Sequence, residues 1–245
     1  MKLIMESPLY TISVTTLICV ISIVGYYINE VRIARRDTAE FISIAETRYG
    51  AELNVSDLSY ERETMLFAIE DPTFRRHHGV DLYTPGAGMT TITQGLVKLL
   101  YFPEGFRPGI AKIRQTLIAQ YALDSLVSKN EQLNLFLNIS YFGNENGKAV
   151  YGFENAAQTY YGKNFTSLTD DEFLTLVAML ISPNKLKPHT KASLERLNRI
   201  KKYLAGDYQP AGVLDFDYNG RRNGSFAEQG LMMFLRFVTN ARPSR

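Results

Sequence analysis

The feature that most constrains this sequence is an uncharged run near its N-terminus, residues 7–29, which reads SPLYTISVTTLICVISIVGYYIN. A helix of about 20 apolar residues is long enough to cross the hydrocarbon core of a bilayer. A buried helix of a soluble protein is the alternative, but such helices seldom lack charge over this length. A cleaved signal peptide fits poorly, because no small-residue cleavage site closes the run. We therefore predict one transmembrane anchor within residues 1–36, with the rest of the chain on a single side of the membrane.

Charges that flank the run bear on the orientation of this anchor. Lys2 precedes the run, whereas Arg32, Arg35 and Arg36 follow it. Positive charge tends to remain in the cytoplasm, so this bias taken alone would place the domain there. The arginines also suit lipid headgroups if a helix leaves the membrane through residues 29–50.

Composition narrows the remainder of the chain to an ordinary folded domain. Hydrophobic residues make up 45% of the sequence and charged residues 21%, which is typical of globular proteins. The net charge of +2 is too small to indicate a nucleic-acid partner. The single cysteine, Cys19, excludes an internal disulfide and a multi-cysteine metal site.

Hydrophobic periodicity and helix-start patterns predict a mainly α domain. Capping-box patterns, in which a hydroxyl residue precedes a glutamate by three positions, occur at Ser128/Glu131, Thr169/Glu172 and Ser225/Glu228. The segment 173–182, FLTLVAMLIS, is apolar on nearly every face and belongs in the middle of a bundle. No segment alternates as a strand would, and GNENGK at 143–148 is predicted to be a loop.

One short segment, FAIEDPTFRRHHGVD at residues 67–81, combines two carboxylates with a cluster of Arg and His. The preceding helix should end at Asp71, because the residue before a proline avoids helical geometry. The C-terminal end of a helix disfavours negative charge, so Glu70 is a candidate for a raised pKa. The pattern suits acid/base chemistry beside an anionic substrate. A surface cluster of ion pairs is the alternative.

Two further segments follow this motif. TTITQGLVKLL, at 90–100, begins with hydroxyl residues, which are most often helix caps, and runs into an apolar helix that carries Lys98. YFPEGFRPG, at 101–109, breaks that helix, and we expect it to expose Tyr101, Phe102 and Phe106.

These segments, in this order, resemble glycosyltransferase family 51, which comprises the monofunctional peptidoglycan transglycosylases and the polymerase domain of class A penicillin-binding proteins. The resemblance extends from about residue 60 to 204. Later blocks match it in SKNEQLNLFLNISYFG, VYGFENAAQTYYGK and SLTDDEFLTLVAMLISPNKLKP. Its first motif, E-D-x-x-F-x-x-H-x-G-x-D, is met by Glu70, Asp71, Phe74, His77, Gly79 and Asp81. Its second, G-x-S-T-I-T-Q-Q-x-x-K, appears as GMTTITQGLVK and keeps Gly88, Thr91, Ile92, Thr93, Gln94 and Lys98.

The resemblance implies a lysozyme-like, mainly helical fold with a larger lobe and a small membrane-dipping lobe. We assign it to residues 37–205 and leave 206–245 as a C-terminal tail with a short helix and no assigned function. It also implies that the GlcNAc 4-hydroxyl of lipid II attacks the anomeric carbon of a growing glycan chain and displaces undecaprenyl pyrophosphate. Glu70 would be the general base, with Asp71 close behind it. The expected substrate-binding residues are Phe74, His77, Gly79, Thr91, Thr93, Gln94, Lys98, Gln115 and Thr116.

The sequence departs from the family at several positions. Met89 and Thr90 replace a small residue and a serine, and Gly95 replaces the second glutamine of the second motif. Counting without gaps, the second family glutamate, in R-K-x-x-E, falls on Thr116. Neither Thr116 nor Gln115 could hold a metal ion as a carboxylate does. Because the second glutamate is missing, a catalytically impaired relative that binds lipid-linked glycan or a cell-wall synthesis partner is an alternative. A lytic hydrolase on the same fold is a third reading.

The remaining expectations follow from the same resemblance. No cofactor is required and no protein metal site is expected, and the divalent cation to consider is Mg²⁺ or Mn²⁺. The expected partners are lipid II, the growing glycan chain, membrane lipid and other cell-wall synthesis proteins, with no nucleic acid. The resemblance places the domain on the outer side of the cytoplasmic membrane, against the charge bias of Arg32, Arg35 and Arg36.

Overall fold

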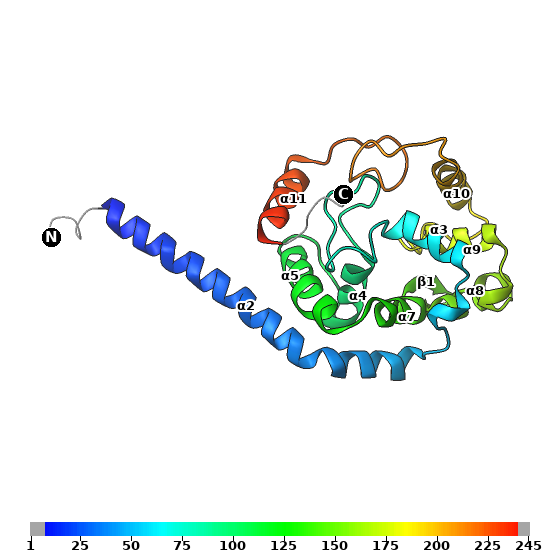
Figure 1. Cartoon of the computed structure of the whole chain (residues 1–245), viewed down its shortest axis with the longest axis horizontal. Helices are drawn as coiled ribbons and strands as arrows, with labels where there is room; N and C mark the ends of the chain where they lie inside the picture. The colour runs from blue at the N-terminus through cyan, green and yellow to red at the C-terminus, as the bar shows by residue number, and fades with distance from the viewer. Residues whose placement is uncertain (1–7, 240–245) are drawn as a thin grey trace.

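A computed structural model of the chain describes residues 8–239. Residues 1–7, which include Lys2, and residues 240–245 lie outside the described part. One long helix projects from a mainly helical domain (Figure 1). The predicted mainly α fold is confirmed.

Helix α2, Pro8–Tyr49, has two halves with different surroundings. Its N-terminal half projects away from the domain (Figure 1), and apolar side chains such as Ile12, Leu17 and Ile21 are exposed there. By length and composition this part of the helix could cross a membrane. The C-terminal half packs on the domain and buries Ala34 and Ala45. The helix therefore runs unbroken through position 36, where we predicted the anchor to end.

The domain is built from short helices joined by tight connections (Figure 1). Hydroxyl side chains cap many of them, and the three predicted capping boxes, at Ser128, Thr169 and Ser225, are confirmed. The elements in chain order are α3 Tyr60–Glu70, α4 Ile92–Tyr101, α5 Ile110–Ile118, a π-helical turn Ala119–Leu123, α6 Asp124–Leu126, α7 Lys129–Ile139, β1 Tyr141–Glu145, β2 Lys148–Tyr151, α8 Phe153–Tyr161, α9 Asp170–Met179, α10 Lys191–Leu204 and α11 Phe226–Val238, with 3₁₀ turns at Val55–Asp57 and Phe165–Ser167.

The strands β1 and β2 form an antiparallel hairpin where we predicted a loop. Its turn is Asn146-Gly147, and both residues have positive φ, 49° and 77°. An Asn-Gly pair with this geometry is the strongest short-range signal for a hairpin. The prediction was wrong because the strands are too short to show alternation.

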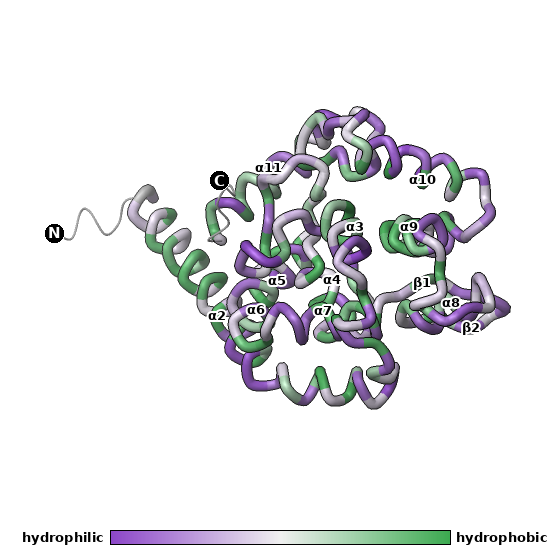
Figure 2. Tube along the Cα trace, turned by 45° about the vertical axis from the view of Figure 1, so that its right-hand side comes forward, coloured by the Kyte–Doolittle hydropathy of each residue, from purple (hydrophilic) through white to green (hydrophobic). Residues whose placement is uncertain are grey.

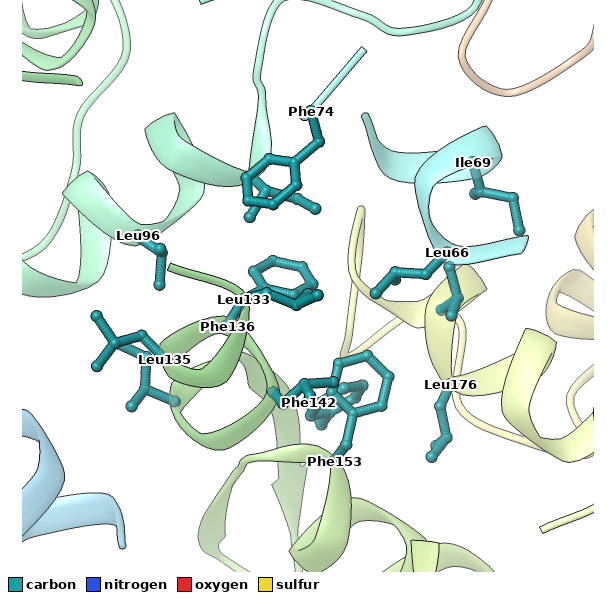
Figure 3. Close-up of a cluster of buried hydrophobic side chains, with 14 of the residues drawn as sticks. Leu66, Ile69, Phe74, Leu96, Leu133, Leu135, Phe136, Phe142, Phe153 and Leu176 are labelled. Carbon is teal, nitrogen blue, oxygen red and sulfur yellow. The ribbon is translucent and has the colours of Figure 1, made fainter. Parts of the chain in front are cut away.

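The hydrophobic core lies between α3, α7, α8 and α9 (Figure 3). Helix α9 is buried along its length, as its uniformly apolar sequence predicts. Leu66 on α3 and Leu176 on α9 face the aromatic cluster of Phe136, Phe142 and Phe153. The core thereby holds the C-terminal end of α3, where Glu70 lies.

The segment between α4 and α5 differs from expectation. Tyr101 is only 5% exposed, and its hydroxyl lies 2.8 Å from that of Thr38 on α2. Phe102 and Phe106 pack edge to face with ring centroids 5.2 Å apart, and both are half-buried. The prediction that all three rings are exposed is wrong, because α2 and the rings themselves cover them. The exposed apolar residue here is Ile110.

Candidate active site

A cavity of about 380 Å³ opens where the end of α3 meets the start of α4. Side chains from both helices, from the loop before α4, from α10 and from the C-terminal segment surround it. Of the predicted site residues, Glu70, Thr91 and Lys98 line it, and so do the family departures Met89, Thr90 and Gly95. The other lining residues are Ile69, Ala87, Gly88, Ile92, Leu99, Phe136, Ser140, Tyr141, Leu180, Ile181, Pro183, Arg196 and Phe216.

Glu70 is the carboxylate of this cavity. It is the last residue of α3, and its Oε1 is shielded from solvent without a hydrogen-bond partner. Burial raises the pKa of the Glu70 carboxyl to about 7, with the charges of Arg196 and Lys98 opposing the rise and that of Asp71 adding to it. A carboxylate with a pKa near neutrality can accept or give up a proton at physiological pH.

Two cationic side chains, Lys98 and Arg196, line the cavity together with Glu70, and Lys112 lies behind the lining residue Thr90. Lys98 lines the cavity with its ammonium 5.2 Å from the centre of the Phe106 ring, and burial lowers its pKa. Arg196 is 1% exposed and donates from Nη1 to Asp217 Oδ1 at 2.6 Å. Lys112 donates to Thr90 Oγ1 at 3.0 Å, and burial lowers its pKa well below the usual value. This arrangement suits an anionic substrate group beside a single base.

Asp71 has a different environment from its neighbour Glu70. Its carboxylate is 1% exposed and lies 2.8 and 2.9 Å from Nε2 of His77. Its Oδ2 also accepts the backbone N–H of Ile92, the first residue of α4, at 3.0 Å. Asp71 therefore ties the end of α3 to the start of α4, and it does not line the cavity.

Other residues of the first motif also hold the end of α3 against the start of α4. Phe74 is buried in the core, 5.1 Å from the Phe67 ring (Figure 3). Gly79 has φ +76°, and a Cβ there would lie 2.5 Å from Ala119 O, so only glycine fits. The Gly79 carbonyl accepts the Thr91 hydroxyl at 2.7 Å. These residues position Glu70 and α4, and neither Phe74 nor Gly79 lines the cavity.

The second motif divides between the cavity and the interior. Thr91 caps α4 by accepting from Gln94 N, so the ordinary reading of its hydroxyl as a helix cap is also correct. Thr93 and Gln94 are fully buried, and Thr93 donates to Gln132 at 2.7 Å. A Cβ at Gly95 would meet no atom within 4 Å, so a larger residue at this position would not clash at its β-carbon.

Gln115 and Thr116 lie in the interface of α4 with α5. Both are 0% exposed. Gln94 Nε2 donates to Thr116 Oγ1 at 2.9 Å, and Gln115 Nε2 donates to the Gln94 carbonyl at 2.5 Å. Neither residue lines the cavity, so our expectation that they face the same cleft as Glu70 is wrong. Their side chains are used in joining two helices.

Sequence reasoning missed Arg196 and Phe216. Arg196 lies in a basic amphipathic helix in which Lys191, Lys201 and Lys202 are exposed and Arg199 is half-buried, and an arginine is seldom expected on the buried face. Phe216 belongs to the tail, where it packs 3.3 Å from the Cβ position of Gly88. Backbone hydrogen bonds from Gly86 N to Gly212 O and from Gly88 N to Val213 O hold the tail on this loop.

The residues around the cavity do not fit a divalent cation. Within residues 8–239, no group of three or more His, Cys, Asp or Glu side chains could hold a metal ion. Lys98 and Arg196, which line the cavity, would also repel one.

Comparison with known proteins shows which family the chain is similar to. A profile of the family described as Transglycosylase matches residues 37–206. Penicillin-binding protein 1A of Streptococcus oralis is 29% identical over 178 residues, which cover 66% of this chain and 27% of that protein. Penicillin-binding protein 1A of Aquifex aeolicus is 33% identical over 152 residues, or 56% of this chain and 20% of that protein.

A shorter relative matches as well. Biosynthetic peptidoglycan transglycosylase of Acinetobacter baumannii is 33% identical over 150 residues, which cover 56% of this chain and 64% of that protein. The matches thus span roughly a quarter of the penicillin-binding proteins and less than two thirds of this relative. Because the family profile covers most of the chain, including α3, α4 and all the cavity-lining residues except Phe216, the chain belongs to the transglycosylase family.

Proposed function

We propose that the chain is a peptidoglycan glycosyltransferase that polymerises lipid II into glycan strands. One observation carries the proposal: Glu70 is the only carboxylate among the described lining residues, and it lies in a cavity with Lys98 and Arg196. The relatives named for peptidoglycan transglycosylation support the same reading.

In the proposed reaction, Glu70 accepts the proton of the GlcNAc 4-hydroxyl of lipid II. The hydroxyl oxygen forms a bond to the anomeric carbon of the growing strand, and the bond from that carbon to the pyrophosphate oxygen breaks with inversion. Undecaprenyl pyrophosphate leaves with the electron pair of the broken bond. Lys98 and Arg196 are placed to stabilise the negative charge of the pyrophosphate as it departs.

The proposed setting is the cytoplasmic membrane. Helix α2 would anchor the domain by a single pass, and the domain would lie on the outer side, where its lipid-linked substrate is polymerised. Lipid II, the growing glycan chain and membrane lipid are the proposed partners, together with other cell-wall synthesis proteins.

A second candidate is a relative that binds lipid-linked glycan without polymerising it. The observation that favours it is the location of Thr116, where the family places a second glutamate: this position is buried away from the cavity. If catalysis requires a carboxylate there, the chain would bind its substrate or a cell-wall synthesis partner and release no product.

The test is polymer formation from purified lipid II by the full chain in detergent or liposomes. Glu70→Gln keeps the shape of the side chain and removes the proton acceptor, so the rate should fall by ~10² to 10⁴. Glu63→Gln is the matched control, because Glu63 lies on the same helix and pairs with Arg75 at the surface. Equal rates for Glu70→Gln and the parent would refute the role of Glu70. No polymer from the parent, with lipid II still bound, would favour the second candidate.

A further inference from the structure

Helix α11 carries an apolar stripe on its outer surface. Phe226, Met233 and Phe237 are 93%, 70% and 87% exposed, and their spacing of seven and four residues puts them on one face of the helix. The opposite face buries Met232 and Leu235 in the domain. Single exposed apolar side chains are common, but three large ones on one face of a short helix indicate a contact surface.

The stripe is held in a fixed position. Arg236 donates from Nη2 to Leu82 O at 2.6 Å, and its guanidinium lies 4.4 Å from the centre of the Tyr83 ring. At the other end of the helix, Ser225 and Glu228 form a capping box. The large apolar residues therefore stay outside because the inner face of α11 is already packed.

The position of α11 indicates what covers the stripe. In both views of the molecule, α11 lies on the side from which the N-terminal half of α2 projects (Figures 1 and 2). Domain contacts with α2 begin near Glu30, which pairs with Arg114 of α5. A membrane crossed by the uncharged part of α2 would therefore end close to this side of the domain.

We propose that α11 lies in the surface of the membrane that α2 crosses, with its apolar stripe among the upper acyl chains. The proposal rests on the membrane anchoring proposed above. Amphipathic helices bind membranes in this way, and burying each large apolar side chain contributes about 1.5–3 kcal/mol. Helix α11 lies beyond residues 37–206, which match the family. A membrane contact through α11 is therefore distinct from any contact through the segment between α4 and α5, which lies within the matched residues.

The absence of tryptophan from the chain gives a site-specific test. Three single variants of the full chain are reconstituted in liposomes with and without lipids brominated on the acyl chain, and tryptophan emission is measured. Phe237→Trp reports on α11. Ile21→Trp, at an exposed position of α2, reports on insertion of the anchor. Leu194→Trp is the negative control, because it is 53% exposed on α10, on the far side of the domain from the N-terminal half of α2 (Figure 1).

We expect brominated lipid to quench Ile21→Trp and Phe237→Trp, and to leave Leu194→Trp unchanged. Quenching of Ile21→Trp alone would overturn the proposal for α11 and leave the anchor intact. A blue-shifted Phe237→Trp that is not quenched would show a protein on the stripe, such as a second copy of the chain, and would equally overturn it. No quenching of Ile21→Trp would instead contradict the proposed anchoring.

Discussion

Helix α3 ends between two carboxyl groups that are surrounded differently. Asp71 is surrounded by donors, from His77 and from the start of α4, whereas Oε1 of Glu70 has no partner and faces cations across a cavity. The position of Glu70 at a helix C-terminus could be predicted from the sequence, and its pKa is raised as expected. The main cause of the raised pKa is burial of Glu70 by segments that are distant in the sequence. A local sequence pattern could not predict that burial.

The pH dependence of polymerisation should reflect this environment. A general base acts when ionised, so the rate should rise with pH through about 7, the pKa of Glu70. At alkaline pH the rate should fall as Lys98 loses its proton. This fall should begin at a lower pH than for an exposed lysine, because burial lowers the pKa of Lys98. Initial rates from pH 5 to 10 would test this. A rate that is flat from pH 5 to 8 would contradict the assignment of Glu70 as the base.

Stability should separate the roles of the two carboxylates. The pKa of Glu70 in the folded chain exceeds its usual value of 4.5, so its contribution to stability is greatest below pH 4.5 and is lost as pH rises through about 7. Glu70→Gln stays neutral, so it should raise the melting temperature at pH 8 by ~2–4 °C, the shift that about 1 kcal/mol produces in a domain of this size. The gain should shrink towards pH 5.

Asp71→Asn should act in the opposite direction. The amide group would turn an N–H towards either His77 or the Ile92 N–H, which leaves a buried donor unsatisfied and costs about 1–3 kcal/mol. Thermal melts followed by circular dichroism would compare the two variants. If Asp71→Asn has the melting temperature of the parent, and Glu70→Gln has a lower one at pH 8, the structural role given to Asp71 and the role of base given to Glu70 are both contradicted.

At the level of elements, the helices could be predicted because each has its own local signal. Capping boxes fixed the starts of α7, α9 and α11, and uniform hydrophobicity placed α9 in the core. The β1–β2 hairpin was missed because its strands are short and only the Asn146-Gly147 turn marks it. The contact of the tail with the loop 82–89 has no local signal at all, since it joins residues more than a hundred positions apart.

We predict that the tail segment affects the pKa of Glu70 through Asp217. Its carboxylate pairs with Arg196 at 2.6 Å and with Arg199 at 2.9 Å. The negative charge of Asp217 partly offsets the positive charge of Arg196, so Arg196 lowers the pKa of Glu70 less than it would alone. Asp217→Asn would leave Arg196 free to stabilise the ionised form of Glu70, which should lower the pKa of that carboxyl. The rising limb of the pH–rate profile should then move to lower pH.

The matched control for this variant is Asp207→Asn, because Asp207 is exposed and lies in the same segment. The measurement is the pH–rate profile of both variants under one substrate concentration. An unchanged profile for Asp217→Asn, with the fold intact, would mean that the tail acts on the cavity through Phe216 alone.

At the scale of the whole molecule, α2 runs without a break from the apolar segment that we propose as the anchor to the domain. Its C-terminal half packs on the domain through Ala34 and Ala45, and Thr38 contacts the hydroxyl of Tyr101 at the end of α4. The cavity is therefore held at a fixed height relative to the membrane that α2 would cross. A fixed height would suit the proposed reaction, because both of its substrates would be anchored in the same bilayer.

The same packing bears on orientation. Of the arginines that would hold the domain in the cytoplasm, Arg35 donates to Tyr121 O and to the Ser125 hydroxyl, and Arg36 pairs with Asp37. Of the two, only Arg36 is paired with a carboxylate, whereas Arg35 bonds neutral oxygens and keeps its charge, so the pairing offsets one charge of this bias.

We predict that the domain lies outside the cytoplasmic membrane. The measurement is a pair of C-terminal fusions, one to alkaline phosphatase, which is active only outside, and one to green fluorescent protein, which folds in the cytoplasm. Phosphatase activity without fluorescence is the expected result. Fluorescence without phosphatase activity would place the cavity on the wrong side for polymerising lipid II, and it would refute both the orientation and the proposed function.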